Sequence, residues 1–240
     1  MICFENVTKA YGKTKAVDHL TMEIPDGQVF GFIGPNGAGK TTTIKLMTGI
    51  LRPDEGTVRL NGLDMAKQPL EAKRTFGYVP DSFDMYERLT GLEYLGFMAD
   101  LYGVGQKERK ERIDHYLDLF ELTDAARQQL RGYSRGMKQK IAIAGALLHE
   151  PSIWILDEPM VGLDPQSVYL LKEEMRRHTQ NGRTVFFSTH VLDVAERLCD
   201  EIGVIKRGKL IAKGTLAQLR GGEKGETLEE LFLELVEKGE

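Results

Sequence analysis

Residues 28–48 read QVFGFIGPNGAGKTTTIKLMT, and this stretch decides the fold. Residues 28–33 are mostly apolar, which is typical of a buried β-strand. The middle is dense in glycine, and residues 40–48 place Ile44 and Met47 at helical spacing. The segment therefore predicts a strand, a tight loop and a helix in direct succession.

The loop matches the pattern G-x-x-x-x-G-K-[ST] at every position, between a predicted strand and a predicted helix. In that setting, backbone N–H groups and the positive end of the helix bind phosphate. We expect Lys40 to reach the β- and γ-phosphates and the Thr41 hydroxyl to bind Mg²⁺. A glycine-rich turn with an exposed lysine is the weaker explanation of a full match. The nucleotide-binding residues expected here are Gly34, Pro35, Asn36, Gly37, Ala38, Gly39, Lys40, Thr41 and Thr42.

The composition is that of an ordinary globular protein. The 240 residues are 41% hydrophobic and carry a net charge of −4, so the chain can bury a sizeable core. This balance gives no reason to expect a nucleic-acid partner, which favours a basic face. Cys3 and Cys199 lack metal-ligand or disulfide spacing, which fits a reducing compartment. No apolar run approaches the ~20 residues of a membrane-spanning helix.

Apolar and polar residues alternate at 2–7 and 16–24, which predicts two antiparallel strands joined by a turn at Tyr11-Gly12-Lys13. Later patterns predict further strands and helices in alternation, which favours an α/β fold. We expect a P-loop NTPase (RecA-like) core with an N-terminal antiparallel β layer. The strands are predicted at 57–60, 77–79, 153–156, 184–188, 201–206 and 209–213, and the helices at 168–179 and 191–199.

A mostly helical pattern over residues 92–148 predicts a helical subdomain inserted in this core at about 83–150. Residues 1–220 are then one nucleotide-binding domain. Residues 221–225 are glycine-rich and predict a linker, and 227–238 predict an amphipathic helix that begins with a capping box of Thr227 and Glu230. That helix either covers its own core or contacts a second chain.

Two acidic residues follow the predicted strand 153–156. Ligands of open α/β sheets bind at the carboxyl ends of the strands, so Asp157 is placed to complete a Mg²⁺ shell. We assign Glu158 to general-base catalysis or to positioning the water that attacks the γ-phosphate. A solvated turn is the usual explanation of an acidic pair, but the P-loop upstream reverses that preference.

Together these residues resemble the ATP-binding subunits of ABC transporters over nearly the whole chain. The segment Gly132-Tyr-Ser-Arg-Gly-Met137 is similar to the signature of that family, with Tyr133 and Met137 in place of Leu and Gln. Ser134 is also a good N-cap for the helix that follows, where free N–H groups would form an anion site.

The resemblance implies a dimer in which Ser134 and Gly136 of one chain complete the nucleotide site of a second ATP-binding subunit, identical or different. It implies that Asp164 links the two sites and that His190 contacts the γ-phosphate as a catalytic residue beside Glu158 and Lys40. Tyr11 falls where the family has an adenine-stacking aromatic, and a strand-end Tyr packing on its neighbours is equally consistent with the sequence. The expected cofactors are ATP and Mg²⁺.

One residue departs from the family pattern. Asp81 follows Gly77-Tyr-Val-Pro80, where the family commonly has Gln. An Asp side chain accepts a hydrogen bond from a metal-bound water but cannot donate one, so we expect Asp81 to contact the Mg²⁺ site. In the family, the Gln at this position also couples the site to the membrane subunit, and the sequence does not assign that second role to Asp81. The aromatic residues near it would form either a docking groove for a partner helix or part of a core: Phe83, Tyr86, Tyr94, Phe97 and Tyr102.

The resemblance implies a cytoplasmic ATPase that is bound at the inner face of the cell membrane through a transmembrane permease subunit. Similarity to the ABC-2 exporter-type branch favours export. The alternative is a soluble ABC-type ATPase with a regulatory or mechanical role and no membrane partner.

Overall fold

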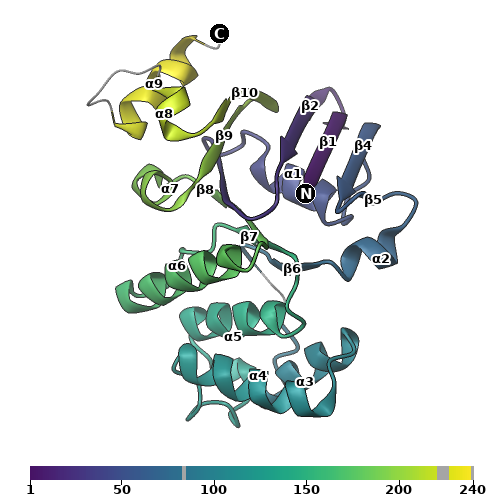
Figure 1. The fold of residues 1–240 in the computed structure, drawn as a ribbon, viewed down its shortest axis with the longest axis vertical. Helices are drawn as coiled ribbons and strands as arrows, with labels where there is room; N and C mark the ends of the chain where they lie inside the picture. Colours follow the sequence, from purple (N-terminus) through teal and green to yellow (C-terminus); the bar gives the residue numbers. More distant parts are fainter. Residues whose placement is uncertain (83–84, 221–226, 239–240) are drawn as a thin grey trace.

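The computed structural model describes residues 1–82, 85–220 and 227–238 (Figure 1). The first sheet is antiparallel, with strand order β2-β1-β4-β5. Along β2, buried and exposed side chains alternate over its second half, as expected for a sheet with one solvated face. The expected antiparallel layer is confirmed. Its strands are β1 (Ile2–Tyr11), β2 (Thr14–Ile24), β4 (Glu55–Leu60) and β5 (Leu63–Asp64).

The second sheet has the order β10-β9-β3-β8-β7-β6 and is parallel except for β10. Every residue of β3, β7 and β8 is buried, because the sheet is covered on both faces. The α/β core is therefore confirmed. The strands are β3 (Val29–Ile33), β6 (Phe76–Val79), β7 (Ile153–Asp157), β8 (Thr184–Thr189), β9 (Glu201–Lys206) and β10 (Lys209–Gly214).

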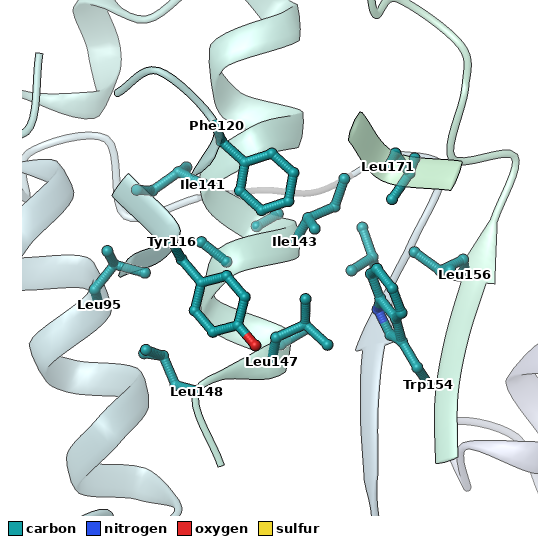
Figure 2. Packing of buried hydrophobic residues seen from close by; sticks show 14 of the residues in the cluster. Leu95, Tyr116, Phe120, Ile141, Ile143, Leu147, Leu148, Trp154, Leu156 and Leu171 are labelled. Carbon is teal, nitrogen blue, oxygen red and sulfur yellow. The ribbon is translucent and has the colours of Figure 1, made fainter. Parts of the chain in front are cut away.

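Alternate residues of β7 belong to two different apolar cores. Trp154 and Leu156 pack in the cluster that contains the middle helices (Figure 2), whereas Ile153 and Ile155 pack against residues of the antiparallel sheet. The side-chain period of two explains this division, since neighbouring residues of a strand face opposite sides of the sheet.

The helical lobe lies between β6 and β7 in the chain and consists of α3 (Gly91–Leu101), α4 (Gln106–Leu119), the 3₁₀ turn η1 (Leu130–Gly132) and α5 (Arg135–Leu147). Figure 1 shows it at the end of the molecule opposite the antiparallel sheet. Thr90 and Glu93 form a capping box that begins α3. Leu147 of α5 lies beside Trp154, so the lobe and the sheet share one apolar core (Figure 2).

The remaining helices follow individual strands. Helix α1 (Lys40–Met47) follows β3, α6 (Pro165–Gln180) follows β7, and α7 (Leu192–Leu198) follows β8. The short helices are α2 (Pro69–Lys73) and α8 (Leu216–Leu219). Helix α9 (Leu228–Lys238) packs on α7 with Leu228 and Leu231 buried, so the first turn of its apolar face covers its own chain. The predicted linker at 221–225 lies outside the described residues.

Several boundaries differ from the sequence prediction. Strand β1 continues past Val7 to Tyr11 because register shifts keep it paired with β2 after the alternation is lost. Tyr11 is thus the last paired residue of β1, opposite Thr14, and the turn consists of Gly12 and Lys13. The short elements β5, α2 and α8 were not predicted, because pieces of this length carry little periodicity.

Gly77 provides a test of the packing between β6 and the helical lobe. A Cβ at this residue would lie 2.2 Å from the Ala146 carbonyl oxygen of α5. We expect Gly77→Ala to lower the free energy of unfolding by about 1–3 kcal/mol, since the backbone must move to admit the methyl group. Urea unfolding of the purified chain measures this change.

Gly96→Ala is the matched control, because a Cβ at this position within α3 meets no atom within 4 Å. It should raise the free energy of unfolding by about 0.5–1 kcal/mol through helix propensity. Stabilisation by both substitutions would contradict the close approach of α5 to β6.

Candidate functional site

The P-loop, residues 34–41, connects β3 to α1 in a conformation that requires glycine. Gly37 and Gly39 have φ angles of 77° and 113°, which side-chain-bearing residues rarely adopt. A Cβ at Gly39 would lie 2.3 Å from the Ala16 carbonyl oxygen of β2. No side chain caps the start of α1, so its first N–H groups are available to an anion.

The turn between β9 and β10 contacts the P-loop through its backbone. The Gly208 N–H donates to the Ala38 carbonyl at 2.8 Å, and the Gly208 carbonyl accepts from the Asp18 N–H at 2.8 Å. A Cβ at Gly34 would lie 2.4 Å from the Ile205 carbonyl oxygen. The backbone that would surround the phosphates is therefore fixed by two neighbouring strands, and binding need not order it.

Lys40 is 7% exposed and points back into the loop. Its Nζ donates to the Gly34 carbonyl at 2.7 Å and lies 3.7 Å from Glu158 Oε1. A buried ammonium is stable only when it is paired and hydrogen-bonded. The predicted phosphate-binding lysine thus lies next to the predicted catalytic carboxylate.

Asp157 ends β7 and is fully buried. Its Oδ1 accepts a hydrogen bond from the Ser188 hydroxyl at 2.5 Å, while Oδ2 has no hydrogen-bond partner in the described part of the chain. Burial raises the pKa of Asp157 above its usual value, and the hydroxyl groups of Ser188 and Thr41 offset part of that rise. One carboxylate oxygen is therefore held by Ser188, and the other has no hydrogen-bond partner in the described residues.

Glu158 connects Lys40 to His190. Its Oε2 lies 3.0 Å from His190 Nδ1. A carboxylate oxygen accepts hydrogen bonds, so this contact is one in which the His190 Nδ1–H donates a hydrogen bond to Glu158. The backbone of Glu158 has φ 49°, a left-handed value that is uncommon for a residue with a side chain and that often occurs at functional sites.

Asp81 is exposed at the end of β6 and lies close enough to Asp157 for its charge to raise the pKa of that group. Its Oδ1 accepts from the Ser82 hydroxyl at 3.2 Å. The structure thus places Asp81 at the edge of the same site, in electrostatic rather than direct contact with Asp157.

Tyr11 lies at the end of the β1–β2 hairpin and is 52% exposed. Ala16, in the same hairpin, touches Gly39 of the P-loop. Tyr11 is therefore partly open to stacking and partly covered by its neighbours, so both interpretations of this residue stay predictions.

Three predicted residues lie away from the P-loop, where α5 and α6 begin. Ser134 caps α5 by accepting from the Met137 N–H at 3.2 Å, and Asp164 caps α6 by accepting from the Ser167 N–H at 3.0 Å. A Cβ at Gly136 would lie 3.0 Å from the Gly162 carbonyl oxygen. Within the described ranges, none of the three hydrogen-bonds to a P-loop residue.

Two polar residues near the site were not identified from the sequence. Ser188 contacts Asp157, and Gln139 of α5 is 4% exposed and donates to the Pro159 carbonyl at 3.4 Å. Ser188 lies in an apolar run, and such a residue inside a buried strand needs a partner. That is the signal that could have identified it.

The site fits a metal ion that nucleotide helps to hold. No group of three or more His, Cys, Asp or Glu side chains able to bind a metal occurs in the described ranges. Asp157 Oδ2 is nevertheless a buried acceptor without a partner. Mg²⁺ commonly takes one or two carboxylates and completes its shell with phosphate oxygens and water, so this donor set suits it.

Comparison with known proteins agrees with this geometry. Residues 17–161 match the family model of the ABC transporter. The linearmycin resistance ATP-binding protein LnrL of Bacillus subtilis is 38% identical, over 96% of this chain and 74% of the relative. An ATP-binding subunit of an ABC transporter has a similar structure, with a TM-score of 0.94 and 36% identity over 98% of this chain and 99% of the other.

A second solved structure is a dimeric ATP-binding cassette in a post-hydrolysis state bound to ADP and Pi. It has a TM-score of 0.79 and 27% identity over 90% of this chain and 99% of that one. The P-loop, the carboxylates that follow β7 and these similarities agree with one another, and the chain belongs to the ABC transporter family as one of its ATP-binding, ATP-hydrolysing subunits.

Proposed function

We propose that two such subunits close around ATP at the strand-end site and drive a separate transmembrane permease, in the direction of export. The observation that carries the proposal is the linked set Lys40–Glu158–His190, with 3.7 Å between the first pair and 3.0 Å between the second. In this proposal the cation, the carboxylate and the imidazole surround the position of a γ-phosphate bound by the P-loop.

In this proposal Thr41 and Asp157 would hold Mg²⁺, and Asp81 would accept a hydrogen bond from a water bound to the ion. The ion, when bound, neutralises charge on the β- and γ-phosphates. Thr41 and Asp157 present a hydroxyl and a free carboxylate oxygen to it. Asp81 adds negative charge at the rim, where the family commonly has a neutral amide.

Glu158 is the general base that takes a proton from the attacking water. His190 orients that carboxylate through the 3.0 Å contact, and its other ring nitrogen, Nε2, would donate to the γ-phosphate, which requires a proton on both ring nitrogens. Lys40 would move from the Gly34 carbonyl to the phosphates, since a phosphate oxygen is a stronger partner for an ammonium than a carbonyl. Tyr11 stacks on the adenine ring.

The γ-phosphate side of this site needs a second subunit, identical or different. Ser134 and Gly136 form an exposed helix start whose N–H groups suit an anion, yet they lie apart from their own P-loop. We infer that Ser134 and Gly136 face the nucleotide of the partner subunit and that Asp164 lies between the two sites. The dimeric cassette bound to ADP and Pi supports this arrangement.

The permease would dock at a groove of about 720 Å³ between the segment after Asp81 and α3. Tyr86 is 67% exposed and Phe97 is 44% exposed, and their rings meet edge to face at 6.0 Å. Tyr94 and Tyr102, in contrast, pack against the buried core, so for these two the core explanation fits. Phe83 lies outside the described residues.

Within the described ranges, no helix has both the length and the apolar character needed to cross a bilayer. We propose that the chain acts in the cytoplasm and is held at the inner face of the membrane by its permease. The linearmycin resistance named for the Bacillus subtilis relative supports export, and it favours transport over a regulatory role without a membrane partner.

The role of Glu158 predicts the behaviour of Glu158→Gln. Removal of the base should lower the turnover of ATP by about 10²–10⁴-fold, because proton transfer in the transition state is lost. ATP should still bind, and the stalled complex should elute as a dimer in gel filtration with ATP and Mg²⁺. Turnover equal to that of the wild type would contradict the assignment.

Lys40→Ala is the matched control for that variant. It removes a phosphate contact rather than the base, so it should weaken the binding of a fluorescent ATP analogue itself. If both variants lost nucleotide binding to the same extent, the separation of roles between Lys40 and Glu158 would be wrong.

The docking groove predicts that partner binding can be lost without loss of folding. Tyr86→Glu should abolish co-purification with the transmembrane partner from detergent extracts, because it places a charge in an apolar contact. Its free energy of unfolding should change by less than about 0.5 kcal/mol, as is usual for exposed residues. Leu70→Glu is the control, since Leu70 is 73% exposed on α2 outside the groove. Unfolding of the Tyr86 variant, or its normal co-purification, would contradict docking there.

A further inference from the structure

The hydroxyl of Ser188 makes two hydrogen bonds at the end of β8, and each reaches a different acidic residue. Ser188 is directly opposite Asp157 in the parallel register of β7 and β8, and it is fully buried. Its Oγ donates to Asp157 Oδ1 at 2.5 Å and accepts from the Glu158 N–H at 3.1 Å. A hydroxyl has one proton, so the bond from Glu158 N–H leaves that proton for Asp157.

The first bond fixes the carboxylate of Asp157. With Oδ1 held by Ser188, the plane of the carboxylate is set, and Oδ2 remains as the buried oxygen without a partner. Without the hydroxyl, Asp157 could rotate about χ2, a broad and weakly restrained torsion. Ser188 therefore determines which oxygen of Asp157 is presented to a metal ion.

The second bond fixes the backbone of Glu158. This residue has φ 49°, a conformation that persists only when the surrounding structure holds it. The bond from its N–H to Ser188 is one such restraint. His190, two residues after Ser188, holds the other end of Glu158 through its carboxylate. The end of β8 thus contacts Glu158 at both its backbone and its side chain.

We propose that Ser188 is a positioning residue for ATP hydrolysis, which aims the free oxygen of Asp157 at the metal and holds Glu158 in its left-handed conformation. It acts through these two residues and does not contact the nucleotide. The inference rests on the proposed roles of Asp157 and Glu158.

The test measures the ATPase rate of the full chain against ATP and against Mg²⁺ concentration. For Ser188→Ala we expect kcat to fall and the Mg²⁺ concentration for half-maximal rate to rise, each by about 10–100-fold, the usual effect of losing a partner that orients a metal ligand. The KM for ATP at saturating Mg²⁺ and the binding of a fluorescent ATP analogue in EDTA should remain close to wild type. Ser188→Thr keeps the hydroxyl and should restore most of the rate.

Thr184→Val is the matched control. Thr184 is a fully buried hydroxyl residue at the other end of β8 that donates to Asp26 rather than to a site residue, and its removal should leave kcat and the Mg²⁺ dependence unchanged. Should Ser188→Ala fail to fold, the nearly isosteric Ser188→Cys carries the same prediction, since a thiol is a weak donor and acceptor.

The inference would be overturned if Ser188→Ala or Ser188→Cys kept the kcat and the Mg²⁺ dependence of the wild type. It would also be overturned if Ser188→Ala and Ser188→Thr lowered kcat to the same extent. The Glu158→Gln variant separates this failure from failure of the proposed function. If Glu158→Gln stalls hydrolysis while Ser188→Ala does not slow it, only the role of Ser188 is wrong. If Glu158→Gln hydrolyses ATP normally, the assignment of Glu158 as the base is wrong, and the role of Ser188, which depends on it, is wrong too.

Discussion

The alignment of three parallel strands is the constraint on which the rest of the structure depends. In β3, β7 and β8, Ile33 lies opposite Thr189, and Asp157 lies opposite Ser188. The P-loop, the two carboxylates and His190 all follow these strand ends, so they meet at one edge of the sheet. The burial of the strands on both faces sets this register, because a shift by one residue would turn every side chain to the other face.

The same constraint explains what a single chain does not bring together. The helical lobe is inserted between β6 and β7. Through Leu147 and Trp154 it shares a core with the face of the parallel sheet that is opposite the antiparallel sheet. The helix start at Ser134, which we propose binds an anion, is therefore built by the lobe and not by the strand ends. Asp164, in turn, caps α6 in the isolated chain. The association of two subunits would give both residues a ligand that their own chain does not present.

The sequence was most informative for functional residues that lie within one short motif. The P-loop and Asp157-Glu158 were predicted because each is a short motif after an apolar strand, and the alternation of strands and helices predicted the α/β core. Ser188 was missed because a hydroxyl in an apolar strand resembles a small core residue until its neighbour across the sheet is known. The aromatic residues near Asp81 could not be divided into core and surface from the sequence, since Tyr94 and Phe97 are both aromatic but differ in burial.

A crystal structure of the Glu158→Gln variant with ATP and Mg²⁺ tests the central claim most directly. The account predicts two chains, with each γ-phosphate between Lys40 of one chain and the helix start at Ser134 of the partner subunit. A structure in which Ser134 lies far from every γ-phosphate, in its own chain and in any other, would contradict it even if Thr41 and Asp157 held the metal ion.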